Sequence, residues 1–505
     1  MDGVIIGEQR LSIADILAVA RGHRAAELSS SKAFRKRIEA GAEFLRELLA
    51  SGEEIYGVNT GFGDSCTTRV PSSLVPELPR QLTRYHGCGL GDYLDAEQTR
   101  AVLAARLVSL SQGYSGIRWT LLEQLAALLD EDVLPLIPAE GSVGASGDLT
   151  PLSYVAAALI GERDVMHRGH RCSAADALAA IGRGPLVLAP KEGLAVMNGT
   201  AVMTGLACIA VDRADYLTRL ACRLTALAAH ALESDRAHFD PQLFALKPHA
   251  GQIECAEWIH ADLEGEAGAP ARLQQRYSIR CAPHVIGVAR DALEWMRRDV
   301  ENELNSANDN PLIDPIGRRV MHGGHFYGGH IAFAMDSLKT AVANLADLMD
   351  RQLALLVDAR FSEGLPGNLT GAQGERAAIN HGFKGVQIGV SAWTAEALKL
   401  TMPASVFSRS TECHNQDKVS MGTIAARDCL RVIQLTEQVA SGHLLAVLQA
   451  IALRARMTGG PLPHRLAAFC DAVAPFCRFV DEDRPLDDEL RQAAAAIAAQ
   501  AWPIH

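Results

Sequence analysis

The sequence predicts a mainly α-helical protein built on a bundle of long helices. Hydrophobic residues make up 48% of the 505 residues but aromatic residues only 5%, which is typical of a helical core rich in alanine and leucine. Apolar residues recur at helical spacing over long windows, at residues 201–233, 284–304, 331–358, 385–400 and 420–456. Up to about residue 195, Gly and Pro separate shorter patterns. We therefore expect an N-terminal domain, residues 1–195, and a helical region, residues 196–505.

The N-terminal domain is expected to carry short helices and the functional loops between them. Residues 99–113 and 120–135 each show a helical pattern. Loops punctuated by Gly and Pro commonly carry binding and catalytic groups. The functional residues should therefore be concentrated in this part of the chain.

The later windows predict long helices with large apolar surfaces. The window 331–358 has one apolar stripe, formed by Met335, Leu338, Val342, Leu345, Met349 and Leu353. The window 420–456 is apolar around most of its circumference, so it must be covered in a bundle core or at a subunit interface. The Ala-rich segment 490–505 predicts a final helix that ends at Pro503.

Charge, apolar stretches and cysteine usage indicate which partners and which cellular compartment the protein has. The formal net charge of -11 and the pI near 5.9 leave no basic footprint, which argues against nucleic acid or an anionic membrane and favours a small-molecule substrate. No apolar stretch is long enough to span a bilayer, and the first residues lack the pattern of a secretory signal. The eleven cysteines are scattered without a CxxC pair, which indicates reduced thiols and a cytoplasmic protein.

The segment GSVGASGDLTPLSY, residues 141–154, contains a tripeptide that is able to form an electrophile from its own backbone. If the Gly147 nitrogen attacks the Ala145 carbonyl carbon with loss of water, and Ser146 loses its hydroxyl, the product is a 4-methylidene-imidazol-5-one (MIO). This cyclisation needs a small residue, a dehydratable residue and a glycine in that order. The tripeptide supplies all three.

Further segments accompany the tripeptide along the chain. They are YGVNTGFG at 56–63, RYHGCGLG at 84–91, KEGLAVMNGT at 191–200, QQRYSIRCAP at 274–283, ELNSANDNP at 303–311, HGGHFYGGH at 322–330, GFKGVQ at 382–387 and ECHNQDKVSMG at 412–422. Together they resemble, in order, the conserved blocks of the aromatic amino acid ammonia-lyase family, which includes histidine, phenylalanine and tyrosine ammonia-lyases and related aminomutases. The resemblance is strongest to a bacterial tyrosine ammonia-lyase-like member.

This resemblance implies a fold, a cofactor and an assembly. The fold is a long-helix bundle of the fumarase/aspartase-like type, assembled as a homotetramer in which each active site draws on three chains. The cofactor is the MIO group formed autocatalytically from Ala145, Ser146 and Gly147, with no external cofactor. The resemblance also implies that Asp148 orders the cyclising loop rather than touching the substrate.

The chemistry of ammonia elimination requires a base as well as the electrophile, because the β-proton of an amino acid is weakly acidic. Tyr56 matches the base of the family. A free phenol has a pKa near 10, so this role requires a local field that favours phenolate, which amides of the glycine loop and neighbouring donors would supply. The glycines around Tyr56 do not form a phosphate loop, since no GK[ST] follows them.

Other positions match residues of the family that hold the substrate. Arg280 matches the residue that grips the substrate carboxylate with its planar guanidinium. The remaining matches are the polar residues Asn198, Gln274, Tyr277 and Gln416, the aromatic Phe326 and the charged pair Lys384 and Glu412. The histidines His322, His325 and His330 raise the possibility of a zinc site, but glycines separate them and no acidic or cysteine ligand accompanies them, so no metal is expected.

Tyr85 and His86 occupy the pair that resembles the ring-selectivity switch of the family. A phenol or imidazole facing the bare ring of phenylalanine would lose a hydrogen-bond partner, whereas a polar ring would supply one. Histidine ammonia-lyases carry a glutamate in the block where this chain has Gln416 followed by Asp417. These features favour L-tyrosine, converted to 4-coumarate.

Several alternatives remain open from the sequence. Histidine ammonia-lyase, with urocanate as its product, ranks second, followed by phenylalanine ammonia-lyase, a lyase of a catechol analogue and an MIO-dependent aminomutase. From other classes come a non-catalytic helical scaffold and a pyridoxal-dependent enzyme that uses Lys384.

Overall fold

The structure is a computed structural model that describes residues 3–265 and 270–505. The chain forms two compact units that are discontinuous in sequence. The first unit consists of Met1–Ala210, Arg297–Asp336 and Pro403–Arg427, and the second of Val211–Met296, Ser337–Met402 and Asp428–His505. The expected division at residues 195 and 196 concerns chain segments rather than compact units, and it stays a prediction.

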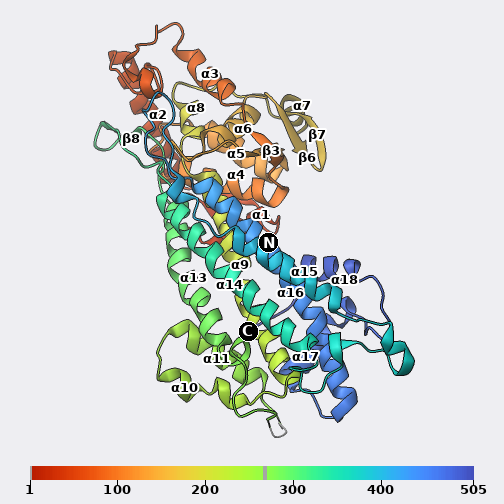
Figure 1. The fold of residues 1–505 in the computed structure, drawn as a ribbon. Helices are drawn as coiled ribbons and strands as arrows, with labels where there is room; N and C mark the ends of the chain where they lie inside the picture. Colours follow the sequence, from red (N-terminus) through yellow and green to blue (C-terminus); the bar gives the residue numbers. More distant parts are fainter. Residues whose placement is uncertain (1–2, 266–269) are drawn as a thin grey trace. The chain divides into compact units, whose positions relative to one another are not determined.

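Helices dominate the structure, which confirms the predicted mainly α class. The five long windows correspond to α9 (Ala201–Ala231), α13 (Ala282–Leu304), α14 (Gly329–Val357), α15 (Lys384–Lys399) and α16 (Gly422–Thr458), as Figure 1 shows. All six residues of the predicted stripe on α14 are fully buried. The apolar periodicity of the sequence therefore located these helices to within about three residues, as expected for long periodic segments.

The first unit packs short helices around the loops of the N-terminal part. Helix α3 (Leu78–Tyr85) packs against α6 (Leu149–Leu159) and α8 (Glu192–Met197), and α4 (Ala96–Leu110) packs against α5 (Trp119–Asp130). The other elements are β1 (Val4–Ile6), α1 (Ile13–Ala20), β2 (Ala26–Leu28), α2 (Lys32–Ser51), η1 (Gly63–Thr67), η2 (Val75–Glu77), β3 (Leu90–Tyr93), β4 (Val133–Pro135), β5 (Pro138–Glu140), β6 (Asp164–His167), β7 (His170–Ser173), α7 (Ala174–Ala180), β8 (Leu312–Asp314), β9 (Arg319–Met321) and η6 (Ser405–Phe407).

Strand β4 corrects one sequence prediction. The helical pattern was extended to residue 135, but α5 ends at Asp130, Asp132 has a φ of 56°, and Val133–Pro135 pairs antiparallel with β6. A left-handed residue terminates a helix, and Val, Leu and Pro then suit a short buried strand. Within residues 3–265 and 270–505, the strands form small sheets of two or three members, and β1 and β2 pair in parallel.

Buried polar contacts join the long helices of the second unit. Gln352 on α14 donates to the Thr225 hydroxyl on α9 at 2.9 Å, and the Thr436 hydroxyl on α16 lies 3.5 Å from the Val342 carbonyl on α14. Arg213 on α9 pairs with the nearly buried Glu437 on α16. The remaining elements are η3 (Arg236–Phe239), α10 (Pro241–Ala245), α11 (Ala250–Asp262), α12 (Tyr277–Arg280), η4 (Gly367–Leu369), η5 (Gly374–Ala378), α17 (His464–Val473), η7 (Ala474–Phe476) and α18 (Asp487–Ala498).

The last helix is shorter than the sequence predicted. Helix α18 ends at Ala498 rather than at Pro503. Gln500 adopts a φ of 54° and the amide of Ala501 donates back to the carbonyl of Ala496, which is the closing bond of a Schellman motif. The chain then turns so that Trp502 is buried and its carbonyl accepts from the hydroxyl of Tyr216.

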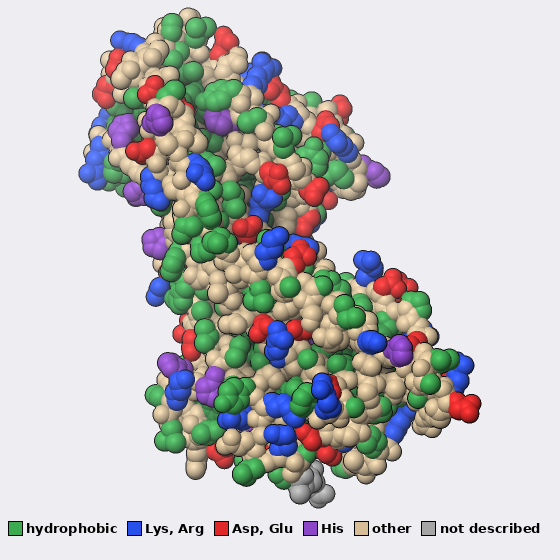
Figure 2. Space-filling view, viewed as in Figure 1, with side chains coloured by type: hydrophobic (Ala, Val, Ile, Leu, Met, Phe, Trp, Pro, Cys, Tyr) green, Lys and Arg blue, Asp and Glu red, His purple; other side chains and the backbone are tan. Residues whose placement is uncertain are grey.

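Surface charge follows the composition. Figure 2 shows Lys and Arg side chains interspersed with Asp and Glu on the visible face, without a broad patch of one sign. Within residues 3–265 and 270–505, no helix combines the length and apolarity that crossing a membrane requires.

Candidate active site

A cavity of about 700 Å³ lies in the first unit and contains the tripeptide. Its lining includes nine of the residues predicted from the sequence: Tyr56, Tyr85, His86, Ala145, Ser146, Gly147, Asn198, Glu412 and Gln416. These residues come from five separate segments of the chain. The fold therefore gathers them around one space large enough for an amino acid.

The tripeptide is held by the backbone at Gly199. The amide of Gly199 donates to the Ser146 carbonyl at 3.2 Å, and the Gly199 carbonyl accepts from the amide of Asp148 at 2.7 Å. Gly147 has a φ of 71°, and a Cβ at this position would collide with the Gly199 carbonyl. Only glycine fits here, for reasons of both conformation and space.

The carboxylate of Asp148 lies behind the tripeptide and is fully buried. It accepts from the amides of Val202 and Met203 at 3.0 Å, which are free donors at the first turn of α9, and from the hydroxyls of Ser142 and Thr423. Burial outweighs these bonds and raises the pKa of Asp148 to about 6. The carboxylate thus joins three segments, and it does not line the cavity.

Asn198 lines the cavity beside the tripeptide, and a buried arginine holds its backbone. Arg106 on α4 is fully buried and donates to the Asn198 carbonyl at 2.6 Å, to the Ala195 carbonyl and to the Asn308 side chain at 3.1 Å. Burial lowers the pKa of Arg106 to about 10, which leaves the guanidinium charged at neutral pH. Arg106 therefore fixes the segment that presents Asn198.

The residues around the tripeptide fit an MIO group. The side-chain oxygen of Asn198 is buried and has no hydrogen-bond partner among the described residues, so this amide has capacity for a further polar group. Ser146 reaches the cavity, where its hydroxyl lies 3.4 Å from the Gln416 amide nitrogen. Gly147 already has the left-handed backbone that a tight fold of the tripeptide requires.

Tyr56 is held by the loop that follows it. The Gly63 amide donates to the phenolic oxygen of Tyr56 at 2.8 Å, which by itself favours phenolate. Burial is the larger effect, and together with the nearby charge of Glu412 it raises the pKa of Tyr56 above its usual value. The sequence led us to expect a local field that favours phenolate. The Gly63 amide contributes to such a field, but the net effect within this chain is a raised pKa, which favours the neutral phenol.

Tyr85 and His86 lie at the C-terminal end of α3, with their ring centroids 4.3 Å apart. His86 Nδ1 lies 3.0 Å from the Leu82 carbonyl, which fixes Nδ1 as the donor and leaves Nε2 as an acceptor in the neutral ring. Burial, followed by the nearby charge of Arg163, lowers the pKa of His86. Tyr85 is 57% exposed in this chain.

Five of the predicted substrate-binding residues are not in the lining of the cavity. Phe326 lies in the first unit and is half-buried. Gln274, Tyr277, Arg280 and Lys384 belong to the second unit, where all but Arg280 are exposed.

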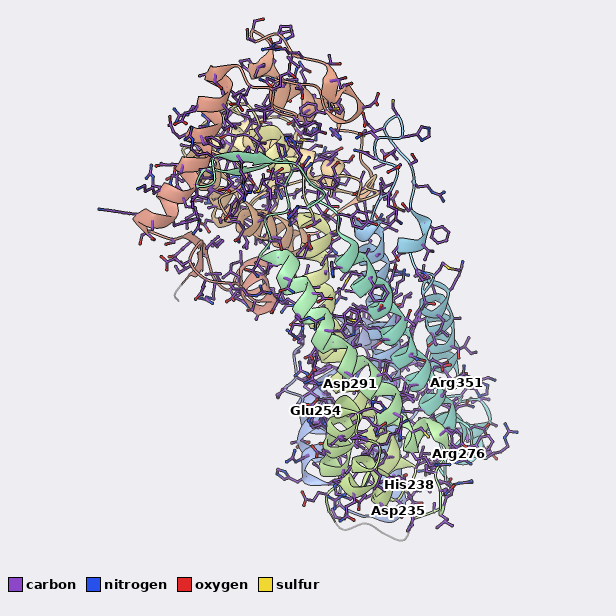
Figure 3. The ribbon with its side chains drawn as sticks, turned by 90° about the vertical axis from the view of Figure 1, so that its left-hand side faces the viewer. Asp235, His238, Glu254, Arg276, Asp291 and Arg351 are labelled. Carbon is purple, nitrogen blue, oxygen red and sulfur yellow. The ribbon has the colours of Figure 1, made fainter. Side chains whose placement is uncertain are left out.

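The segment 274–280 is fixed within the second unit by its neighbours. The Gln275 amide donates to His238 Nε2 at 3.0 Å, Arg276 pairs with Glu363 at 3.3 Å, and Arg280 Nε donates to the Gln275 carbonyl at 2.8 Å. Figure 3 shows His238 and Arg276 at the same end of this unit.

The histidines considered for zinc lie on the surface. His322, His325 and His330 are all exposed. In the described parts of the chain, no group of three or more His, Cys, Asp or Glu residues is arranged to hold a metal ion.

The sequence did not single out the apolar wall or the support of the cavity. The wall is formed by Phe62, Leu82, Leu149 and Leu194, and the support by Arg106 and Asn308. Phe62 and Leu194 lie inside the blocks at 56–63 and 191–200, so those blocks did contain a signal for them. Nothing in the pattern of α4 distinguishes Arg106 from a surface arginine.

Comparisons with known proteins agree with this geometry. The family model described as aromatic amino acid lyase matches residues 11–474. Histidine ammonia-lyase from Alkaliphilus oremlandii (strain OhILAs) is 36% identical over 501 residues, covering 98% of this chain and 97% of that protein. Tyrosine aminomutase from Streptomyces globisporus aligns with a TM-score of 0.92 at 33% identity, over 99% of this chain and 97% of that one. Phenylalanine aminomutase from Pantoea agglomerans gives 0.91 at 31% identity, over 99% and 98%. The chain therefore belongs to the aromatic amino acid lyase family, a family of carbon–nitrogen lyases.

Proposed function

We propose that the protein eliminates ammonia from L-tyrosine to give 4-coumarate, with no external cofactor. The observation that carries this proposal is the shared cavity, in which the Ala145–Ser146–Gly147 tripeptide, the phenol of Tyr56 and the imidazole of His86 line one space. For an amino acid bound in this space, the tripeptide acts on the amine, Tyr56 acts at the β-carbon and His86 contacts the ring.

Tyr56 is the base in this proposal. Its phenolic oxygen takes the β-proton, the C–H electron pair becomes the second bond of the alkene, and the C–N bond breaks to release ammonia. The MIO group formed from the tripeptide supplies an electrophilic carbon that makes the amine a better leaving group. Because the pKa of Tyr56 is raised within this chain, the phenolate requires positive charge from the substrate ammonium and from Arg280.

His86 selects the ring. With Nδ1 bound to the Leu82 carbonyl, the acceptor Nε2 is the nitrogen left for a ligand. A phenolic hydroxyl donates to this acceptor, whereas the bare ring of phenylalanine would leave it desolvated and unpaired. The apolar side chains of Leu82, Leu149 and Leu194 cover the rest of the ring.

The site is completed by neighbouring subunits in this proposal. The family resemblance places Arg280, Tyr277, Gln274 and Lys384 around the substrate, and Tyr277 is 71% exposed in the single chain. Large apolar side chains are also exposed on the long helices, among them Val288, Phe333 and Ile388. A homotetramer that buries these faces would bring the carboxylate-binding Arg280 of one subunit to the cavity of another.

Histidine is the second candidate substrate. The curated relative from Alkaliphilus is named histidine ammonia-lyase, and an imidazole N–H satisfies the same acceptor on His86. Against it, the block that carries a glutamate in histidine ammonia-lyases reads Gln416 followed by Asp417 in this chain. The amide of Gln416 lines the cavity, whereas Asp417 is exposed and is not part of the lining. This block therefore offers an amide to the substrate imidazole, and the carboxylate of Glu412, which also lines the cavity, already accepts from the Asp64 amide.

The proposal is tested by offering purified protein L-tyrosine, L-histidine and L-phenylalanine separately. Conjugated acid is followed by ultraviolet absorbance, products are separated by chromatography, and Tyr56→Phe serves as the control. We expect 4-coumarate from tyrosine, little cinnamate, and no product from the control. Urocanate as the main product would establish the histidine alternative, and a β-amino acid would establish an aminomutase. An intact mass without the loss of two water molecules would contradict the MIO group and favour a scaffold.

A further inference from the structure

We propose that Arg163 is a positioning residue for ring selection, which fixes the last turn of α3 and thereby the imidazole of His86. This inference rests on the proposed function, because it concerns how the cavity recognises the ring of its substrate. Arg163 lies in the turn between α6 and β6, 77 residues after His86.

Arg163 makes its contacts from a fixed position beneath α3. Its Nη2 donates to the Thr83 carbonyl at 2.6 Å, and its Nη1 donates to the Ser153 hydroxyl at 3.0 Å. The guanidinium also lies over the ring of Tyr154, 4.3 Å from its centroid. A planar fork that binds two acceptors and stacks on an aromatic face has little freedom to move.

Both acceptors lead directly to His86. Thr83 follows Leu82, whose carbonyl holds the imidazole Nδ1 at 3.0 Å. The Ser153 hydroxyl donates to the Thr150 carbonyl at 2.7 Å and also lies 3.2 Å from the backbone carbonyl of His86. Arg163 therefore restrains the backbone on both sides of the hydrogen bond that sets the tautomer of His86.

The residue after His86 is adapted to this contact. A Cβ at Gly87 would overlap the Nη2 atom of Arg163. Glycine at this position lets the guanidinium approach the end of α3, and any larger residue would displace it. The close approach of Arg163 to α3 thus requires both the arginine and the glycine at position 87.

The neighbouring ion pairs of α3 offer a matched control. Glu162, the residue before Arg163, pairs with Arg80 at 2.7 Å and with Arg84 at 2.9 Å on the outer side of the helix. Both arginines are exposed, and exposed pairs of this kind contribute little. Arg80 thus shares the anchoring of α3 with Arg163, but among the described residues its ion pair is with Glu162 and not with a group that holds the imidazole.

The charge of Arg163, like its hydrogen bonds, helps to keep Nε2 of His86 an acceptor. Burial and the guanidinium both lower the pKa of His86, so the ring stays neutral and Nε2 stays an acceptor. The other titratable and charged groups around this contact are Tyr85, Tyr154, Cys88 and Glu162. A protonated His86 would present a second donor and would lose the preference for a hydroxyl group.

The test compares wild type, Arg163→Gln, Arg163→Lys and the control Arg80→Gln. The first readout is the ratio of kcat/KM for tyrosine to kcat/KM for phenylalanine. The second is the ratio of affinities for 4-coumarate and cinnamate, measured by calorimetry, since these acids differ only in the phenolic hydroxyl. We expect Arg163→Gln to lower both ratios by about tenfold, mainly through KM, while kcat for phenylalanine and the intact mass stay unchanged. Arg80→Gln should leave both ratios as in wild type.

Arg163→Lys separates positioning from folding. Lysine keeps the charge but cannot donate as a planar fork, so we expect an intermediate ratio at the thermal stability of wild type. The proposal is overturned if the ratios of Arg163→Gln equal those of wild type, or if Arg80→Gln lowers them equally. A wild type that shows no preference for a para-hydroxyl would instead contradict the proposed tyrosine substrate. If histidine is the substrate, the ratio of histidine to phenylalanine replaces the first readout.

Discussion

The backbone amide of Gly63 donates to the phenolic oxygen of Tyr56 at 2.8 Å, while the next amide, that of Asp64, is bound by both carboxylate oxygens of Glu412 at 3.0 Å. One loop therefore holds the proposed base and a carboxylate side by side. The amide lowers the pKa of Tyr56, whereas burial and the charge of Glu412 raise it. The rate of proton abstraction should depend on the balance between these effects.

Removing the charge of Glu412 should make Tyr56 a base at lower pH. In wild type the pKa of Tyr56 is raised, so the phenolate fraction and kcat grow as pH rises through the neutral and alkaline range. Glu412→Gln removes a cause of that rise but keeps an acceptor for the Asp64 amide. We expect the rising limb of the kcat–pH profile to move to lower pH. A profile that does not move would show that Glu412 does not act on Tyr56.

Gly147→Ala should prevent the tripeptide from maturing. The added Cβ meets the Gly199 carbonyl, and a φ of 71° is unfavourable for alanine. We expect an intact mass without the loss of two water molecules, and no activity. Gly182→Ala is a matched control, since Gly182 has a φ of 70° and open space around it. Mass loss in Gly147→Ala equal to that of wild type would contradict the close packing at Gly199.

The sequence predicted the tripeptide and Tyr56 because each lies in a contiguous segment whose order alone carries the signal. The long helices were predicted because their apolar period persists over many turns. The predicted helix extended beyond the end of α5, because a run of apolar residues after Asp132 suits a short strand as well as a helix.

Supporting contacts between distant segments could not be predicted from the sequence. Arg106 reaches Asn198 over 92 residues, and Arg163 reaches Thr83 over 80 residues. In sequence each is an ordinary arginine, because only packing decides whether a guanidinium meets solvent or a buried carbonyl. Arg280 and Lys384 illustrate a different limit, since a single chain assigns them to the second unit and their proposed role depends on assembly.

Arg106→Met should destabilise the first unit. The substitution leaves the carbonyls of Asn198 and Ala195 buried without the guanidinium donor, while Asn308 Oδ1 still accepts from the Ser109 hydroxyl at 2.9 Å. We expect the free energy of unfolding to fall by about 3 kcal/mol or more, as for other buried charged partners. The control is Arg100→Met on the same helix, whose partner Asp132 is about one-third exposed and which should cost less than about 1 kcal/mol. Equal losses in the two variants would contradict the special role of the buried guanidinium.

His443 on α16 makes the second unit sensitive to acid. It is fully buried, and neither ring nitrogen has a hydrogen-bond partner among the described residues. Burial lowers the pKa of His443 to about 3, whereas an unfolded chain binds this proton near pH 6.5. A depressed pKa in the folded state contributes stability above the unfolded value and loses it as pH falls. For this one proton the loss is about 1.4 kcal/mol per pH unit between about 6.5 and 3.

His443→Leu should therefore protect the protein most strongly at acidic pH. Leucine fills a similar volume, removes an unpaired donor and takes up no proton. Urea unfolding at fixed protein concentration should show a variant at least as stable as wild type near neutral pH. At about pH 5 its advantage should grow by about 2 kcal/mol, which is the free energy that the unfolded wild type gains by binding this proton. His464→Gln, which removes an exposed histidine, should follow the wild-type acid profile. If the curves of His443→Leu and wild type stay parallel down to this pH, His443 is hydrated or paired in solution and the imidazole does not set the acid limit.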